Sequence, residues 1–248
     1  MRVLAWLSVL LLVLPLAACG EDDGNTSPRS LTVLAAASLT DVFEGMADDF
    51  EADHEGAEIT FSFGSSTDLA EQVADGAPGD VLATADETSM QVADDAGVAG
   101  EVEPFATNVL VIVTPPDNPA GIESLADLED ATWVRCADDV PCGRVAQGVL
   151  EAKGITTEPA SLEEDVRATL DKVVSGEADA GLVYASDAVV AGDAVTTIEI
   201  PGSEEELTSY FVTTLEQAED ADLGQAWVDY LTSEDGRAAL EEAGFGLP

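Results

Sequence analysis

Three points of the chain place a serine, a glycine or both where a helix is expected to begin. They are the segments Ala36-Ala37-Ser38, Gly64-Ser65-Ser66 and Pro141-Cys142-Gly143. The first N–H groups of a helix have no partner within it, and with the helix dipole they attract anions, to which a serine hydroxyl adds a further donor. A single serine at such a position is more often a plain N-cap. Several of these corners in one chain nevertheless predict an anion-binding site.

The other residue types that can do chemistry give little support to catalysis or to a metal site. The chain has one histidine, His54, on a polar stretch, and no Gly-x-Ser-x-Gly segment, so hydrolysis would lack both a placed base and a nucleophile elbow. The spacing of Cys136 and Cys142 matches no common zinc pattern. We therefore expect a binding protein rather than an enzyme, without a cofactor and without a bound metal cation.

The charge balance excludes nucleic acid as a partner. Fifty-one acidic residues face eight basic residues, which gives a formal net charge of −43. Such a field repels nucleic acid and anionic lipid headgroups. The acids are spread along the whole chain, which favours a solvated surface adapted to high salt over an acidic tail. A hydrophobic content of 46% is too high for a disordered chain.

The first residues are typical of an exported lipoprotein. Arg2 precedes an apolar run that is too short to be a good membrane-spanning helix. The segment Leu16-Ala17-Ala18-Cys19-Gly20 resembles the lipobox of bacterial lipoproteins, which implies a signal peptide at residues 1–18 and lipidation of Cys19. Residues 19–30 would then form a polar, flexible tether. The alternative is an ordinary secretory signal with a chance cysteine. We expect an extracytoplasmic protein, anchored to the cell membrane by lipid.

Two further cysteines, Cys136 and Cys142, remain in the exported part of the chain. In an oxidising compartment, two cysteines of one domain more often form a disulfide than a reactive pair. The sequence therefore favours a disulfide between them.

The order of the expected elements predicts an α/β fold. A buried strand at 31–36, a helix over 39–50, a strand at 59–63, a helix ending at Gly76 and a strand at 81–85 alternate regularly. This alternation implies a mostly parallel sheet covered by helices on both faces. The later part repeats the pattern, with strands at 108–114, 132–136, 181–185, 195–200 and 210–214, helices from Pro141 and from Ser161, and two C-terminal helices.

Seven short motifs occur in one order along the chain. They are Ala35-Ala-Ala-Ser-Leu-Thr, Phe63-Gly-Ser-Ser-Thr-Asp-Leu, Gly76-Ala-Pro-Gly-Asp-Val-Leu, Val140-Pro-Cys-Gly, Glu164-Asp-Val-Arg, Val183-Tyr-Ala-Ser-Asp-Ala and Gly244-Phe-Gly. In sequence and in order, these motifs resemble the periplasmic molybdate-binding protein family. The resemblance implies a type II periplasmic-binding fold, in which two α/β lobes close on a tetrahedral oxyanion held in the cleft between them. It implies a first lobe at 31–107, completed by 211–248, and a second lobe at 108–210.

The resemblance also implies the residues that hold the anion. Ser38 and Ser66 would each offer a hydroxyl and a backbone N–H, Cys142 and Val166 would each offer a main-chain N–H, and Tyr184 would donate its phenol. The family usually has a small residue such as alanine at the position of Cys142, which a main-chain contact tolerates.

Three charged residues lie close to these positions in the sequence. Asp68 follows Ser66 and is expected to face solvent in the first turn of its helix, where an acid is favourable. Arg144 and Arg167 are expected to have structural roles, because a helical neighbour of a ligand points away from it. Whether Asp68 or Arg144 touches the anion stays open at this point.

A site made only of donors favours molybdate or tungstate. Both ions carry no proton at neutral pH, whereas phosphate usually carries one that would face another donor. Sulfate is unprotonated too but smaller. The expected function is capture of molybdate, and of tungstate, by a monomer that serves the permease and ATPase subunits of an ABC importer. The alternative is a protein of the same fold for another oxyanion, such as sulfate or phosphate.

The acidic composition leads to a prediction about salt. Repulsion between carboxylates reaches over ~30 Å at 0.01 M salt and over ~3 Å at 1 M salt. The thermal midpoint of unfolding should therefore rise strongly from dilute buffer to molar salt, as measured by circular dichroism. A midpoint that stays level or falls over this range would contradict adaptation to salt.

Overall fold

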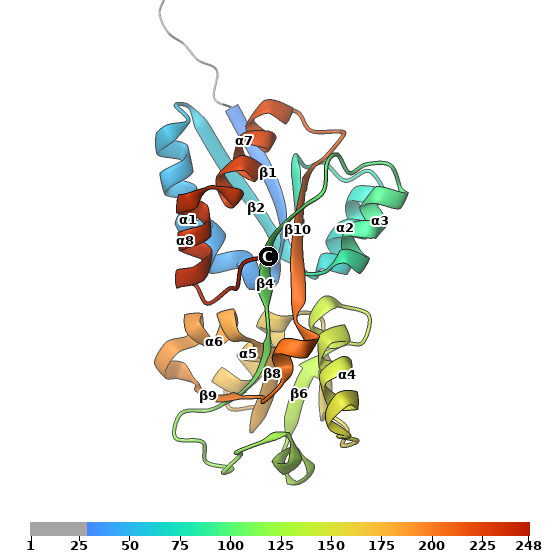
Figure 1. The fold of residues 1–248 in the computed structure, drawn as a ribbon, viewed down its shortest axis with the longest axis vertical. Helices are drawn as coiled ribbons and strands as arrows, with labels where there is room; N and C mark the ends of the chain where they lie inside the picture. Colours follow the sequence, from blue (N-terminus) through green and yellow to red (C-terminus); the bar gives the residue numbers. More distant parts are fainter. Residues whose placement is uncertain (1–28) are drawn as a thin grey trace, which may run out of the picture.

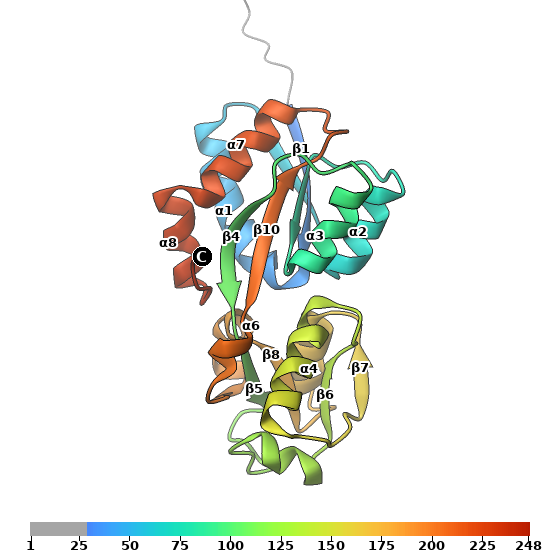
Figure 2. The same ribbon diagram turned by 45° about the vertical axis from the view of Figure 1, so that its right-hand side comes forward.

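The computed structural model describes residues 29–248, which form two α/β lobes joined end to end (Figures 1 and 2). Each lobe has a five-stranded sheet, with the strand order β2-β1-β3-β10-β4 in lobe 1 and β7-β6-β8-β5-β9 in lobe 2. The predicted signal peptide at 1–18 and the lipidated Cys19 lie outside the described residues. Within these residues no helix is long and apolar enough to cross a membrane.

Lobe 1 is a mixed sheet with helices on both faces. Strands β1 (Arg29–Ala36), β2 (Ala57–Gly64) and β3 (Val81–Thr84) are parallel, while β10 (Thr208–Thr214) runs antiparallel between β3 and β4 (Glu103–Asn108). One face packs against α1 and the C-terminal helices, and the other against α2 and α3. These helices are α1 (Thr40–Asp53), α2 (Ser66–Ala74), α3 (Glu87–Asp95), α7 (Ala221–Thr232) and α8 (Glu234–Glu242), with a 3-10 turn η1 (Ala37–Leu39) before α1.

Lobe 2 has the same construction around a second core. Its strands are β5 (Leu110–Thr114), β6 (Trp133–Cys136), β7 (Ser161–Glu163), β8 (Ala180–Tyr184) and β9 (Thr196–Glu199). Strands β6, β7 and β8 are parallel, and β5 pairs antiparallel with β8 and β9. Its helices are α4 (Pro141–Lys153), α5 (Val166–Val174) and α6 (Ala185–Ala191), with 3-10 turns η2 (Leu125–Asp130), η3 (Gly192–Ala194) and η4 (Ser203–Glu206).

The chain passes between the lobes twice. It leaves lobe 1 between Asn108, the last residue of β4, and Leu110, the first of β5, and it returns through η4 into β10. The strand predicted over 108–114 is therefore divided between two sheets. The Asn108 side chain accepts the N–H of Val109, the residue between the two strands, at 3.0 Å. Strand β10 begins at Thr208, before the predicted lobe boundary at 211.

Two other local predictions are wrong. The segment from Ser161 forms β7 instead of the start of a helix, and α5 begins at Val166 with Asp165 as its N-cap, which accepts the N–H of Ala168 at 2.9 Å. Residue Arg29, predicted to lie in the tether, already belongs to β1, where its guanidinium makes two 2.7 Å bonds to Asp220. An ion pair to the N-cap of α7, 191 positions later in the chain, thus fixes the start of the first strand.

Candidate anion-binding site

A small cavity of about 20 Å³ lies where the two lobes meet. Its walls come from the carboxyl ends of β1 and β2 and the first turn of α2 in lobe 1, and from the carboxyl end of β8 and the first turns of α4 and α5 in lobe 2. A volume of this size holds a solute of a few atoms and excludes a sugar or a peptide. All five residues predicted as ligands line it, namely Ser38, Ser66, Cys142, Val166 and Tyr184.

Three helix N-termini from the two lobes converge on this cavity. Ser66 is the first residue of α2, Cys142 the second of α4 and Val166 the first of α5. N–H groups in a first turn have no partner within their helix, and each helix adds partial positive charge at this end. No side-chain cap occupies the first turns of α2 and α4. The backbone therefore provides an electropositive cradle without a cationic side chain in the lining.

Each of the two predicted serine ligands is held by a second contact. The Oγ of Ser66 accepts the backbone N–H of Ala85 at 2.9 Å, which leaves the Ser66 proton free to be donated into the cavity. The Oγ of Ser38 lies 2.8 Å from the phenol oxygen of Tyr210, which in turn lies 3.4 Å from the Asn108 amide nitrogen. With Asn108 donating to Tyr210 and Tyr210 donating to Ser38, the Ser38 proton also remains available.

Two buried hydroxyls at the cavity have no hydrogen-bond partner within residues 29–248. They are the phenol of Tyr184 and the Oγ of Ser65. Burial raises the pKa of Tyr184 well above its usual value of 10, so the phenol stays protonated and can donate. Because a buried donor without a partner costs free energy, both hydroxyls are suited to donating to a bound acceptor. Ser65 was not among the predicted ligands, although its position beside Ser66 at the same corner was visible in the sequence.

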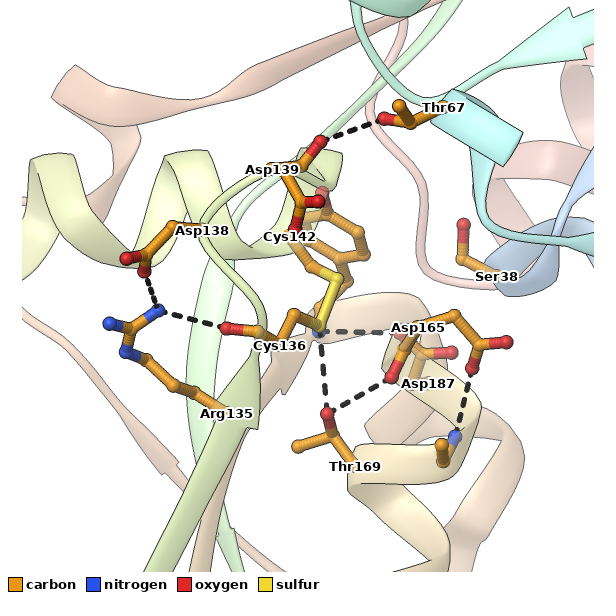
Figure 3. The surroundings of a disulfide bond; sticks show 12 residues. Ser38, Thr67, Arg135, Cys136, Asp138, Asp139, Cys142, Asp165, Thr169 and Asp187 are labelled. Carbon is orange, nitrogen blue, oxygen red and sulfur yellow. Dashed lines mark hydrogen bonds and ion pairs between the residues drawn. A yellow bond between two sulfur atoms is a disulfide. The ribbon is translucent and has the colours of Figure 1, made fainter. Parts of the chain in front are cut away.

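A disulfide supports the lobe 2 wall of the cavity. Cys136, at the end of β6, is bonded to Cys142 in the first turn of α4, with 5.7 Å between their Cα atoms (Figure 3). Gly143 lies so close to the loop that a Cβ there would be 1.7 Å from the carbonyl oxygen of Ala137. Arg135 also braces the loop by donating to the carbonyl of Cys136 at 2.8 Å. The disulfide and the close packing of Gly143 therefore hold the backbone of Cys142 in place at the cavity.

Asp68, Arg144 and Arg167 do not line the cavity, whereas Asp165, the neighbour of Val166, does. Asp68 is exposed on α2. The guanidinium of Arg144 pairs with Asp86, and that of Arg167 pairs with Asp41 and Asp187. Both arginines are therefore bound to carboxylates beside the site.

Asp187 is a fully buried carboxyl group one turn from the phenol of Tyr184. One of its oxygens accepts the backbone N–H of Tyr184 at 3.2 Å, and the other lies 3.0 Å from Nε of Arg167. Burial raises its pKa from 3.8 to about 7, and the neighbouring Arg167 limits the increase. Asp187 therefore links the N-terminus of α6 to the first turn of α5.

A larger hollow elsewhere is a poorer candidate for an anion. A groove of about 660 Å³ lies between α1 and α8 and shares no lining residue with the small cavity. Its lining includes the acids Asp41, Asp49, Asp53, Asp235 and Glu242. Carboxylates gathered in this way repel an anion.

The fold and the cavity together define a two-lobe solute-binding protein with a site for a small anion. The profile of the bacterial extracellular solute-binding protein family matches residues 31–246. The molybdate-binding protein ModA of Mycobacterium tuberculosis is 38% identical, with 96% of this chain and 95% of the relative covered. ModA of Escherichia coli is 30% identical, with 88% and 89% covered. The chain belongs to the bacterial extracellular solute-binding protein family, and its resemblance to the molybdate-binding proteins is confirmed.

The solved structures agree with the type II fold expected from the sequence. The periplasmic molybdate-binding protein of Azotobacter vinelandii superposes with a TM-score of 0.79 at 21% identity, covering 88% of this chain and 99% of that protein. The family and its relatives are solute-binding proteins, so this chain is not an enzyme. As an extracellular solute-binding protein it works outside the cytoplasm.

Replacing the buried carboxyl group of Asp187 should change the pH dependence of stability. Folding raises the pKa of Asp187 from 3.8 to about 7. The contribution of this carboxyl group to the free energy of unfolding is therefore fully present below its unfolded-state pKa and is lost as the pH rises through its folded-state pKa. The stability advantage of the wild type over Asp187→Asn should therefore be larger at pH 5 than at pH 8, by on the order of a few kcal/mol. Urea unfolding at both pH values measures it, with the exposed Asp193→Asn as control. An advantage that grows with pH would contradict this assignment.

Proposed function

We propose that this protein captures molybdate, and tungstate with it, outside the cytoplasm and delivers it to an ABC importer. The observation that supports this proposal best is a cavity of about 20 Å³ between the lobes, lined by hydroxyl and N–H donors from both of them. Asp165, the acid in the lining, directs a carboxylate oxygen to the N–H of Ala168 at 2.9 Å. A fully deprotonated tetrahedral ion accepts from every side and suits such a site, whereas a protonated phosphate leaves one proton facing a donor.

The ligand set follows the predicted one. Ser38 and Ser66 donate through hydroxyl and backbone groups, Cys142 and Val166 through main-chain N–H groups, and Tyr184 through its phenol. An organic acid would call for an arginine that grips its carboxylate. The nearby Arg144 and Arg167 are engaged by aspartates instead, which supports an inorganic oxyanion.

The remaining parts of the proposal concern the membrane. Residues 1–18 act as a signal peptide, Cys19 carries the lipid, and the polar segment after it spaces the folded lobes from the membrane. The lobes act as a monomer, whose partners are the permease and ATPase subunits of a molybdate importer. The names of the M. tuberculosis and E. coli relatives support molybdate as the cargo.

A competition experiment tests the ligand. The soluble protein without residues 1–28, titrated with molybdate in a calorimeter, should bind one ion per chain, and tungstate should displace it. Sulfate and phosphate should compete at least a hundredfold more weakly, because one is too small for the closed cavity and the other carries a proton. Sulfate binding as tight as molybdate binding would refute the assignment.

Removing single donors tests the site. A hydrogen bond to a charged group is worth about 1.5–3 kcal/mol, so Ser66→Ala and Tyr184→Phe should each weaken molybdate binding by roughly tenfold to a hundredfold. Ser65→Ala should also weaken it, because its buried hydroxyl has no partner within residues 29–248. Calorimetric titration measures each change.

The exposed Ser62→Ala, in the same lobe, and Tyr230→Phe, away from the cavity, serve as matched controls and should bind like the wild type. If Ser66→Ala, Tyr184→Phe and Ser65→Ala all match these controls, the cavity is not the binding site.

A further inference from the structure

Arg144, on α4 of lobe 2, reaches Asp86 at the start of α3 in lobe 1. Figure 2 shows α3 and α4 on the same side of the molecule. The Nε and Nη2 of Arg144 both lie 2.7 Å from a carboxylate oxygen of Asp86. Its Nη2 also donates to the Oγ of Ser89 at 3.0 Å. Thr67 of lobe 1 adds a neutral contact by donating to the carbonyl of Asp139 in lobe 2 at 2.8 Å.

Arg167 makes a second connection on the side of α1 and α5. It lies in the first turn of α5, and its Nη2 is 2.5 Å from a carboxylate oxygen of Asp41 on α1 of the other lobe. Its Nε is 3.0 Å from Asp187 within its own lobe. The Arg167 side chain is largely buried, with 23% of it exposed. One cation is thus shared between a carboxylate of each lobe.

Both connections lie beside the proposed anion ligands on either side of the cleft. Arg144 is close in sequence to Cys142, and Arg167 follows Val166 directly. On lobe 1, Asp41 lies on the helix that follows Ser38, and Asp86 adjoins the residue whose N–H holds Ser66. Any movement that separates the lobes must break these pairs and separate the proposed ligands together.

The net charge of the chain makes these ion pairs more important for holding the lobes together. With 51 acidic residues and 8 basic ones, two acidic lobes repel each other when they approach. Arg144 and Arg167 place cations at the interface, where partly buried pairs are screened less by salt than exposed ones.

We propose that Arg144 and Arg167 are positioning residues that clasp lobe 2 to lobe 1 through Asp86 and Asp41 and set how slowly the closed protein releases its anion. The role of the clasps in release rests on the proposed function, whereas their effect on lobe closure does not. Neither arginine touches the anion. They act by holding the donors of the two lobes at the distance at which both reach it.

Two substitutions on lobe 1 test the clasps without disturbing the arginines. Asp41→Asn removes the cross-cleft partner of Arg167 and leaves its pair with Asp187. Asp86→Asn weakens the pair with Arg144 and keeps an N-cap for α3, since asparagine caps as well as aspartate. Each removes a negative charge near the site, so charge alone would make the protein hold an anion more tightly. If the clasps hold the lobes together, each variant should instead hold the anion less tightly.

We expect each variant to release molybdate about tenfold faster in stopped-flow tryptophan fluorescence, with association changed by less than about twofold. Asp68→Asn removes a similar charge near the site without a clasp and should release no faster than the wild type. Arg29→Gln removes an arginine paired within lobe 1 and should also match the wild type. Arg144→Gln combined with Asp86→Asn should release no faster than the faster of the two single variants.

Small-angle scattering separates the two proposals. With or without molybdate, the double variant Asp41→Asn, Asp86→Asn should have a larger radius of gyration than the wild type. If the wild type binds no oxyanion, the proposed function fails while this comparison still tests the clasps. Release as slow as in the wild type, or an unchanged radius of gyration in the double variant, would overturn the inference.

Discussion

The first turns of three helices, α2, α4 and α5, impose the geometry on which the site depends. A chain with a net charge of −43 cannot attract an anion through its overall field. It can do so where backbone N–H groups point at one spot, because these dipoles are fixed by the helix and need no cationic side chain. Parallel strands followed by helices place such N-termini at the carboxyl end of a sheet. In this protein the carboxyl ends of the two sheets face each other, so helix N-termini from both lobes surround the cavity.

The residues around the cavity hold these donors in place rather than adding charge to it. Ala85 fixes the hydroxyl of Ser66, and Tyr210 fixes that of Ser38. The Cys136–Cys142 disulfide and the close packing of Gly143 hold the first turn of α4. Donors fixed before a ligand arrives lose little conformational entropy on binding. A rigid cavity of this size also distinguishes ions by radius, which a flexible loop could not do.

The sequence predicted the parts of this arrangement that depend on local pattern. The α/β order follows from hydrophobic periodicity, and the motif resemblance placed Ser38, Ser66, Cys142, Val166 and Tyr184 on one cavity, which they line. Local pattern failed at Ser161, where pairing with β6 makes a strand of a segment that resembles a helix start. It also could not reveal the bond between Ser38 and Tyr210, which are 172 positions apart. Ser65 and Ser66 look equivalent in the sequence, and only burial and bonding partners show that their hydroxyls differ.

The arrangement of the arginines follows from the cost of burying charge. A guanidinium inside a closed cavity would bind carboxylates, phosphate and sulfate alike, and without an anion it would be a buried, unpaired cation. Beside the cavity, paired with aspartates, the same side chain remains neutralised and still acts across the cleft. In the proposed function, anion recognition depends on neutral donors, whose number and placement discriminate between anions by protonation and size. Closure depends on ion pairs between lobes, whose strength depends on partners at Asp41 and Asp86 that lie outside the cavity. Because the two tasks use different residues, the rate of release can change through substitutions on the lobe surfaces while the choice of ion stays the same.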